Sequence, residues 1–136
     1  MTQRIFVDAN ILASRTLLDW LFHFCCANPR MFQLHSTEDV FVEAAHTMRK
    51  RYPRAGGGLI ANRVEKIRAV IDEVLPDFPS EGPFTGRDVG DYHVHAAAVA
   101  SHADFFPTNN DPTDITRTPE EEPYEVISAD LSLIHI

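Results

Sequence analysis

Apolar and polar positions along this chain follow two different spacings. Short runs rich in β-branched and aromatic residues predict four strands, at residues 4–7, 31–34, 104–106 and 125–128. Longer segments with apolar residues three and four positions apart predict four helices, at residues 16–27, 36–52, 59–75 and 88–102. Because strands and helices alternate, we expect an α/β fold with a mostly parallel sheet between layers of helices.

Polar and helix-breaking residues predict how these elements are connected. A turn is expected at Asp8-Ala9-Asn10 and a loop at Gly56-Gly57-Gly58, while Ser36 is the expected N-cap of the second helix. Prolines and glycines at 76–86 predict an irregular connection. The acidic stretch 118–123 is expected to be a solvated loop.

The composition is that of one globular domain, since the chain has 136 residues and 44% of them are hydrophobic. No apolar run approaches the roughly 20 residues of a membrane span, and the N-terminus lacks a signal-peptide pattern. The adjacent Cys25 and Cys26 disfavour a disulfide. We therefore expect a protein of the cytoplasm, without a membrane partner.

The net charge of −8 disfavours nucleic acid as a partner on average, but the charge is unevenly distributed. Residues 1–71 contain ten Lys and Arg against six Asp and Glu, whereas residues 72–136 contain two against fourteen. Seven of the twelve basic residues fall between 49 and 68. This cluster predicts a surface that binds an RNA backbone, with a solvated helix face as the alternative.

Acidic residues follow the predicted strands, and others lie on the predicted helices. In a parallel sheet the carboxyl ends of the strands share one edge, which is where ligands bind. We expect the acids to meet there, with Asn110 beside them; the candidates are Asp8, Glu43, Asp88, Asp91, Asp111 and Asp114. Converging carboxylates repel one another unless a cation neutralises them, and Mg²⁺ or Mn²⁺ prefers such oxygen ligands. A site of this kind suits phosphodiester hydrolysis by activated water.

Four of these acids also have a purely structural interpretation. Asp8 is a common residue type in a turn after a strand, and Glu43 is consistent with a solvated helix residue. Asp88 and Asp91 together are consistent with an N-cap and a capping-box acid. The order of the acids along the chain and their positions at strand ends favour the functional interpretation.

The motifs in their order resemble those of PIN domains. Arg4-Ile-Phe-Val-Asp8-Ala-Asn10 is similar to the family's opening strand and Asp, and Glu43 lies in a helix where the family has its second acid. The segment 88–98, with an Asp before an alanine-rich helix, resembles the family's third block. The strand that ends at Thr108-Asn-Asn resembles its last.

The resemblance implies a three-layer Rossmann-like sandwich of about five strands and an Mg²⁺- or Mn²⁺-dependent endoribonuclease. It implies Asp8, Glu43 and Asp91 as metal ligands, assisted by Asp88. Many small members are VapC-type toxins that form homodimers and bind a cognate antitoxin, so RNA, an antitoxin and a second copy are the expected partners.

Two features depart from the PIN pattern. One residue too many precedes the last acid, which leaves Asp111 and Asp114 as alternatives, with Asn110 orienting water or metal. The chain ends where the family continues a helix and strand. From about residue 131, the ending resembles translated adapter sequence, so we expect a truncated or non-native end there.

Histidines and tyrosines add little to the site. No Cys and His quartet has structural-zinc spacing, and His95 is placed one turn after Asp91, where it could touch the site. Tyr52 and Tyr92 could stack on a base, but packing at the edge of the core is the expected role. Two other functions remain open: a haloacid-dehalogenase-like phosphatase, although Asn10 stands where that family has its second Asp, and a non-catalytic RNA-binding or scaffold module.

Overall fold

The chain folds around a sheet of five parallel strands. The structure is a computed structural model that describes residues 2–28, 30–76, 83–108 and 111–128. The strands pair in the order β3-β2-β1-β4-β5, and every pairing is parallel. Their bounds are β1 Gln3–Phe6, β2 Phe32–Thr37, β3 Glu73–Leu75, β4 Phe105–Thr108 and β5 Glu125–Ser128. The α/β prediction with a largely parallel sheet is therefore confirmed.

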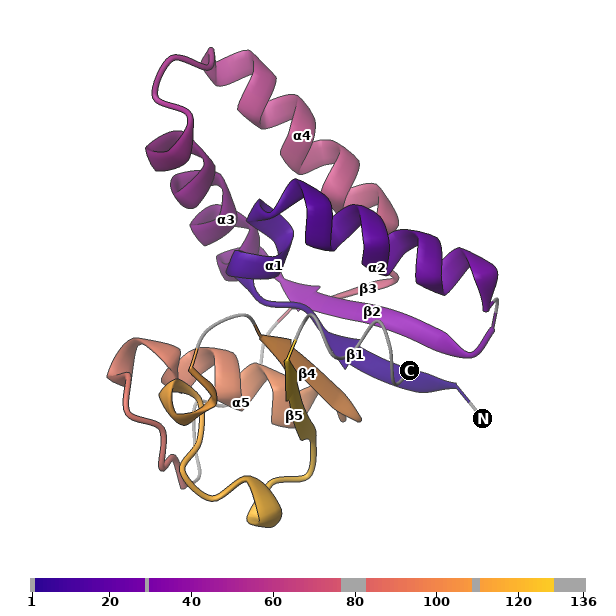
Figure 1. Cartoon of the computed structure of the whole chain (residues 1–136), viewed down its shortest axis with the longest axis vertical. Helices are drawn as coiled ribbons and strands as arrows, with labels where there is room; N and C mark the ends of the chain where they lie inside the picture. Colours follow the sequence, from indigo (N-terminus) through magenta and orange to yellow (C-terminus); the bar gives the residue numbers. More distant parts are fainter. Residues whose placement is uncertain (1, 29, 77–82, 109–110, 129–136) are drawn as a thin grey trace.

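Helices connect the strands and cover the sheet (Figure 1). The α-helices are α1 Ala9–Ala13, α2 Arg15–Ala27, α3 Glu38–Arg51, α4 Gly57–Val70 and α5 Tyr92–Ala100. Three short 3₁₀ helices lie in the second half of the chain. They are η1 Val89–Asp91, η2 Pro112–Asp114 and η3 Pro119–Glu121. In Figure 1, α1 to α4 group on one side of the molecule and α5 lies with β4 and β5 on the other. The arrangement is consistent with a three-layer Rossmann-like sandwich.

The central strand β1 lies in the middle of the core. Ile5 and Phe6 are fully buried, and the Phe6 ring stacks on Phe106 of β4 with centroids 6.0 Å apart. On α5, Ala97 and Ala98 are also fully buried. Their small side chains let this helix approach the sheet closely, which explains why an alanine-rich segment is used there.

The last part of the predicted helix 59–75 is instead a strand. Helix α4 ends at Val70, and Glu73–Leu75 pair with β2 as β3. Asp72 starts this pairing, because the Leu34 amide donates to its carboxylate at 2.7 Å and its own amide donates to the Leu34 carbonyl at 2.9 Å. Val74 and Leu75 match the apolar period of a helix, so the period alone favoured the wrong element.

The helix starts also differ from the predictions by one or a few residues. The expected turn at Asp8-Ala9-Asn10 opens α1, with Asp8 as its N-cap. Ser36 lies in β2 and its hydroxyl donates to the Val7 carbonyl, whereas Thr37 caps α3 by accepting from the Val40 amide. Gly57 and Gly58, expected in a loop, belong to α4.

Several sequence-based expectations fall outside the described residues. These include most of the irregular connection, at residues 77–82, as well as Asn110 and the ending from about residue 131. In the part of the chain that the structure describes, no helix has the length and apolar character needed to cross a bilayer.

Candidate functional site

The carboxyl end of β1 delivers Asp8 to the edge of the sheet. Its side chain is partly buried, and one carboxylate oxygen accepts from the Asn10 amide at 2.7 Å. Burial is the main cause that raises the pKa of Asp8 to about 6, and the charge of Glu43 raises it further. The backbone amides of Asn10 and Ile11 act in the opposite direction. The two amides therefore offset only part of the energetic cost of ionising Asp8 in the folded protein.

Asp91 stands where η1 passes into α5. It occupies the N-cap position, yet its side chain makes no capping hydrogen bond. Burial raises the pKa of Asp91 to about 7, and the neighbouring carboxylates raise it further: in order of effect they are Asp88, Asp8, Asp114 and Glu43. Four of the other five acids that the sequence singled out thus act electrostatically on Asp91 at this edge of the sheet.

Glu43 reaches this group from α3, which packs against α1. Its side chain is exposed, while the next residue, Ala44, is buried in the core. Glu43 also lines an open depression of about 580 Å³ between α3 and His93 of α5. It is a solvent-accessible member of the acidic group, within electrostatic range of Asp8 and Asp91.

Asp114 is held in place by a contact between two distant segments. The Arg87 amide donates to the Thr113 carbonyl at 2.7 Å, and the Asp88 amide donates to the Asp114 carbonyl at 3.3 Å. The Arg87 guanidinium then binds one Asp114 carboxylate oxygen through Nη2 at 2.7 Å and Nε at 2.9 Å. Sequence reasoning did not single out Arg87, because nothing local in the sequence indicates that it meets Asp114.

Asp88 and Asp111 bind mainly to their own backbone. Asp88 accepts from the Gly90 amide at 2.9 Å. Asp111 is exposed and caps η2 by accepting from the Thr113 amide and hydroxyl, and these bonds, with the nearby Arg87, lower the pKa of Asp111. Of the two alternatives for the last acid, Asp114 is the one whose charge acts on Asp91. Asn110 lies outside the described residues.

The donor chemistry of the acidic group fits a hard divalent cation, because every donor is a carboxylate oxygen. Among the side chains that the structure describes, however, no three His, Cys, Asp or Glu residues are arranged as ligands of one metal ion. A shared cation would therefore require these carboxylates to move closer together. It would also require Asp114 to exchange its contact with Arg87.

His95 does not belong to the acidic group. His95 is buried. Its Nδ1 lies 2.7 Å from the Tyr124 hydroxyl and 3.5 Å from a Glu122 carboxylate oxygen. Glu122 also accepts from the Thr116 hydroxyl at 3.2 Å, and only 9% of its side chain is exposed. The expectation of a solvated loop is therefore wrong for Glu122, which helps to anchor α5 beside β5.

The tyrosines differ in environment. Tyr92 packs edge-on against Phe84, with ring centroids 5.3 Å apart. Tyr52 is 57% exposed at the end of α3, so it is not the core-edge residue expected from the sequence.

Comparison with known proteins does not assign a family to the chain. No model of a known protein family matches it, and no curated protein sequence matches it. The resemblance to PIN domains stays a prediction that rests on the motifs of the sequence.

Proposed function

We propose that this protein is a Mg²⁺- or Mn²⁺-dependent endoribonuclease that hydrolyses RNA phosphodiester bonds. The observation that carries the proposal is the gathering of Asp8, Glu43, Asp88, Asp91 and Asp114 at the edge where ligands bind to parallel sheets. These acids come from different segments of the chain. Their mutual repulsion is the kind of cost that a divalent cation offsets.

In this proposal Asp8, Glu43 and Asp91 hold the cation, and Asp88 and Asp114 support them. A bound divalent cation supplies charge stabilisation at the phosphate and lowers the pKa of water. The chain itself must present ionised carboxylates, so activity is expected to rise with pH as Asp8 and Asp91 lose their protons, around pH 6 to 7. In this proposal Arg87, which Asp114 holds beside the group, contacts the RNA backbone.

The direct test compares Asp8→Asn and Asp91→Asn with the wild type in an assay of Mn²⁺-stimulated RNA cleavage. Both variants should lose at least a hundredfold in rate, since each removes a ligand charge, while circular dichroism shows an unchanged fold. Asp19→Asn is the matched control, because Asp19 is an exposed acid on α2. Wild-type cleavage by both site variants, or turnover of small phosphate esters without any RNA cleavage, would contradict the proposal.

The proposal extends to the expected partners. As a toxin of the VapC type, the protein would act in the cytoplasm as a homodimer and be inhibited by a cognate antitoxin. Light scattering on the purified chain tests the dimer, with a mass near twice 15.3 kDa as the expected result. A monomer at all concentrations would contradict it.

A further inference from the structure

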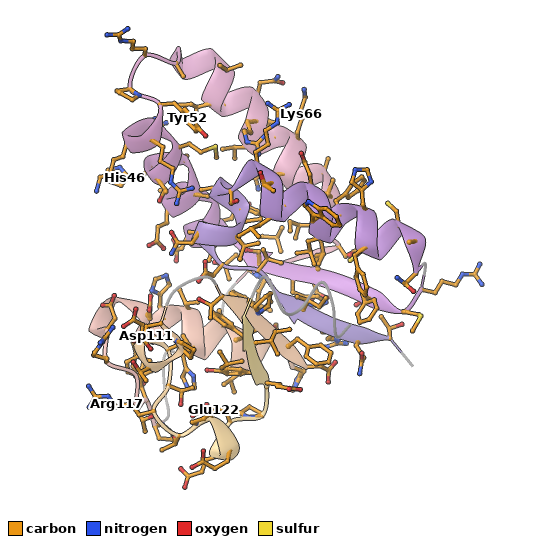
Figure 2. All side chains as sticks on the ribbon, viewed as in Figure 1. His46, Tyr52, Lys66, Asp111, Arg117 and Glu122 are labelled. Carbon is orange, nitrogen blue, oxygen red and sulfur yellow. The ribbon has the colours of Figure 1, made fainter. Side chains whose placement is uncertain are left out.

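A cavity opens between the end of α3, helix α4 and the junction of α1 with α2. Its volume is about 420 Å³, which is within the range of small-ligand sites. Figure 2 shows Tyr52 at the end of α3 and Lys66 on α4, and both residues line the cavity. We call it the cationic pocket, because Arg15 and Arg63 line it together with Lys66. The acids of the proposed cation site are not part of its lining, so it is a separate site.

The spacing of residues on α4 explains how one helix supplies most of the pocket's polar groups. Leu59, Arg63 and Lys66 are four and three residues apart, so they follow one another along the same face of the helix. Arg15 is the first residue of α2 and reaches the pocket from a different element. The three cations therefore converge on one cavity from two elements of the fold.

The cations of the pocket lack acidic partners. Among the described residues, no Asp or Glu oxygen lies within 4 Å of Arg15, Arg63 or Lys66. Arg68 of the same helix differs, since its Nη2 donates to Glu38 at 3.0 Å. Nη2 of Arg63 is buried and has no hydrogen-bond partner in the part of the chain that the structure describes. A buried donor without a partner costs free energy, and an anionic oxygen that enters the pocket would offset this cost.

The rest of the lining is largely apolar. Met48 and Ile60 are buried at the base of the pocket, whereas Leu59 is 64% exposed and the Tyr52 ring is 57% exposed. Covering such side chains is favourable, because it removes apolar surface from water. A ligand with an apolar body would cover them beside its charged group, and inorganic phosphate would not. The combination of unpaired cations and exposed apolar surface therefore favours an organic anion.

We propose that the cationic pocket binds a small organic anion with a doubly charged head, such as a phosphate monoester, and an apolar body. Arg15, Arg63 and Lys66 bind the head through charge-assisted hydrogen bonds. The apolar body packs on Leu59 and the Tyr52 ring. This inference does not depend on the proposed ribonuclease function, because the pocket is separate from the acidic group and its ligand needs no metal ion.

The test is calorimetric titration of the metal-free protein with phenyl phosphate at about pH 8, where a phosphate monoester is doubly charged. We expect saturable binding, with inorganic phosphate about fivefold weaker or more because it lacks the ring. Benzyl alcohol, which has the ring without the charge, should not bind.

Two exposed residues of the pocket separate the charged head from the apolar body. Lys66→Ala should raise Kd for phenyl phosphate about tenfold, since it removes a charge-assisted hydrogen bond. Leu59→Ser should raise Kd for phenyl phosphate about threefold, and it should leave Kd for inorganic phosphate unchanged. Lys50→Ala is the matched control, because Lys50 is an exposed α3 cation outside the lining of the pocket, and its Kd should stay within about twofold of the wild type.

Three results would overturn the proposal. The first is no saturable binding of phenyl phosphate by the wild type, or wild-type affinity in both Lys66→Ala and Leu59→Ser. The second is equal affinity for phenyl phosphate and inorganic phosphate, because the apolar surface would then contribute nothing. The third is tighter binding of poly-glutamate or of an RNA oligonucleotide that Lys66→Ala abolishes, because the occupant would then be a macromolecule. None of these results bears on RNA cleavage, since Lys66→Ala and Leu59→Ser leave the acidic group intact.

Discussion

Burial and like charge govern the ionisation of the two acids nearest the strand ends. Asp8 and Asp91 have pKa values raised to about 6 and about 7, from an ordinary value of 3.8. The folded protein therefore binds these protons more tightly than the unfolded chain does. Stability is present while the acids are protonated and is lost as pH rises from about 4 to about 7.

Replacing Asp8 should therefore stabilise the metal-free protein. Asp8→Asn removes the buried charge but keeps an oxygen that can cap α1. At pH 8 in EDTA we expect the free energy of unfolding in urea to rise by about 1–3 kcal/mol. Asp19→Asn, at an exposed site on α2, should change it by less than about 0.5 kcal/mol. A less stable Asp8→Asn protein would contradict this prediction, because it would mean that the fold stabilises the ionised Asp8 carboxylate.

His35 responds to pH in the opposite direction. It is 1% exposed in β2, its Nδ1 has no hydrogen-bond partner among the described residues, and burial lowers the pKa of its imidazole below 6.5. Glu73 and Asp72 favour the charged ring and Arg4 opposes it, but desolvation is the larger effect. Protonation thus favours the unfolded chain, so His35 costs stability as pH falls below 6.5. An NMR titration should give a pKa below 6.5 for this ring. A value above 6.5 would contradict burial as the dominant effect on His35.

At the scale of elements, the contact between residues 86–88 and 113–115 brings Asp88 and Asp114 together. Gly86 makes this contact possible, because a Cβ there would lie 2.7 Å from the Ile115 carbonyl oxygen and would also contact the Asp114 carbonyl and the Phe84 ring. No local sequence pattern in either segment indicates that it contacts the other segment. This is why the Arg87 and Asp114 pair could not be predicted from the sequence.

Gly86→Ala should therefore disturb both stability and the acidic group. We expect the free energy of unfolding to fall by about 1–3 kcal/mol, since two backbone segments must separate, and Mn²⁺ affinity to fall with it. Gly58→Ala is the control, because a Cβ at Gly58 has nothing within 4 Å and the residue lies in α4. This control should gain up to about 1 kcal/mol. Equal stability of the two variants in thermal unfolding would contradict the role of Gly86.

The strands and helices themselves were largely predictable, with instructive exceptions. Local patterns identified β1, α2, α3 and β5 closely, because their apolar periods and end signals agree. Strand β3 was not predicted, since its three residues continue the helical period of α4 and only pairing with β2 makes them a strand. The burial of Glu122 was not predicted because it depends on contacts with Thr116 and His95, which no local pattern reveals.

At the scale of the whole molecule, the fold brings acids from both halves of the chain together at one edge of the sheet. The parallel sheet brings Asp8 and Glu43 of the first half beside Asp88, Asp91 and Asp114 of the second. Arg49 of α3 lines a hollow together with Glu43, whereas Arg63 and Lys66 of α4 line a different cavity. Four of the acids that the sequence singled out act electrostatically on Asp91 in the structure, but the sequence did not reveal that Arg68 contacts Glu38 and Glu65 while Arg63 and Lys66 line a cavity.

The central claim is that the gathered acids bind a divalent cation. Isothermal titration of the wild type with Mn²⁺ at pH 6.5 tests it most directly. We predict saturable binding with release of protons from Asp8 and Asp91, less release at pH 9, and loss of the heat signal in Asp91→Asn. Absence of saturable binding in the wild type, or unchanged binding in a folded Asp91→Asn protein, would contradict the account.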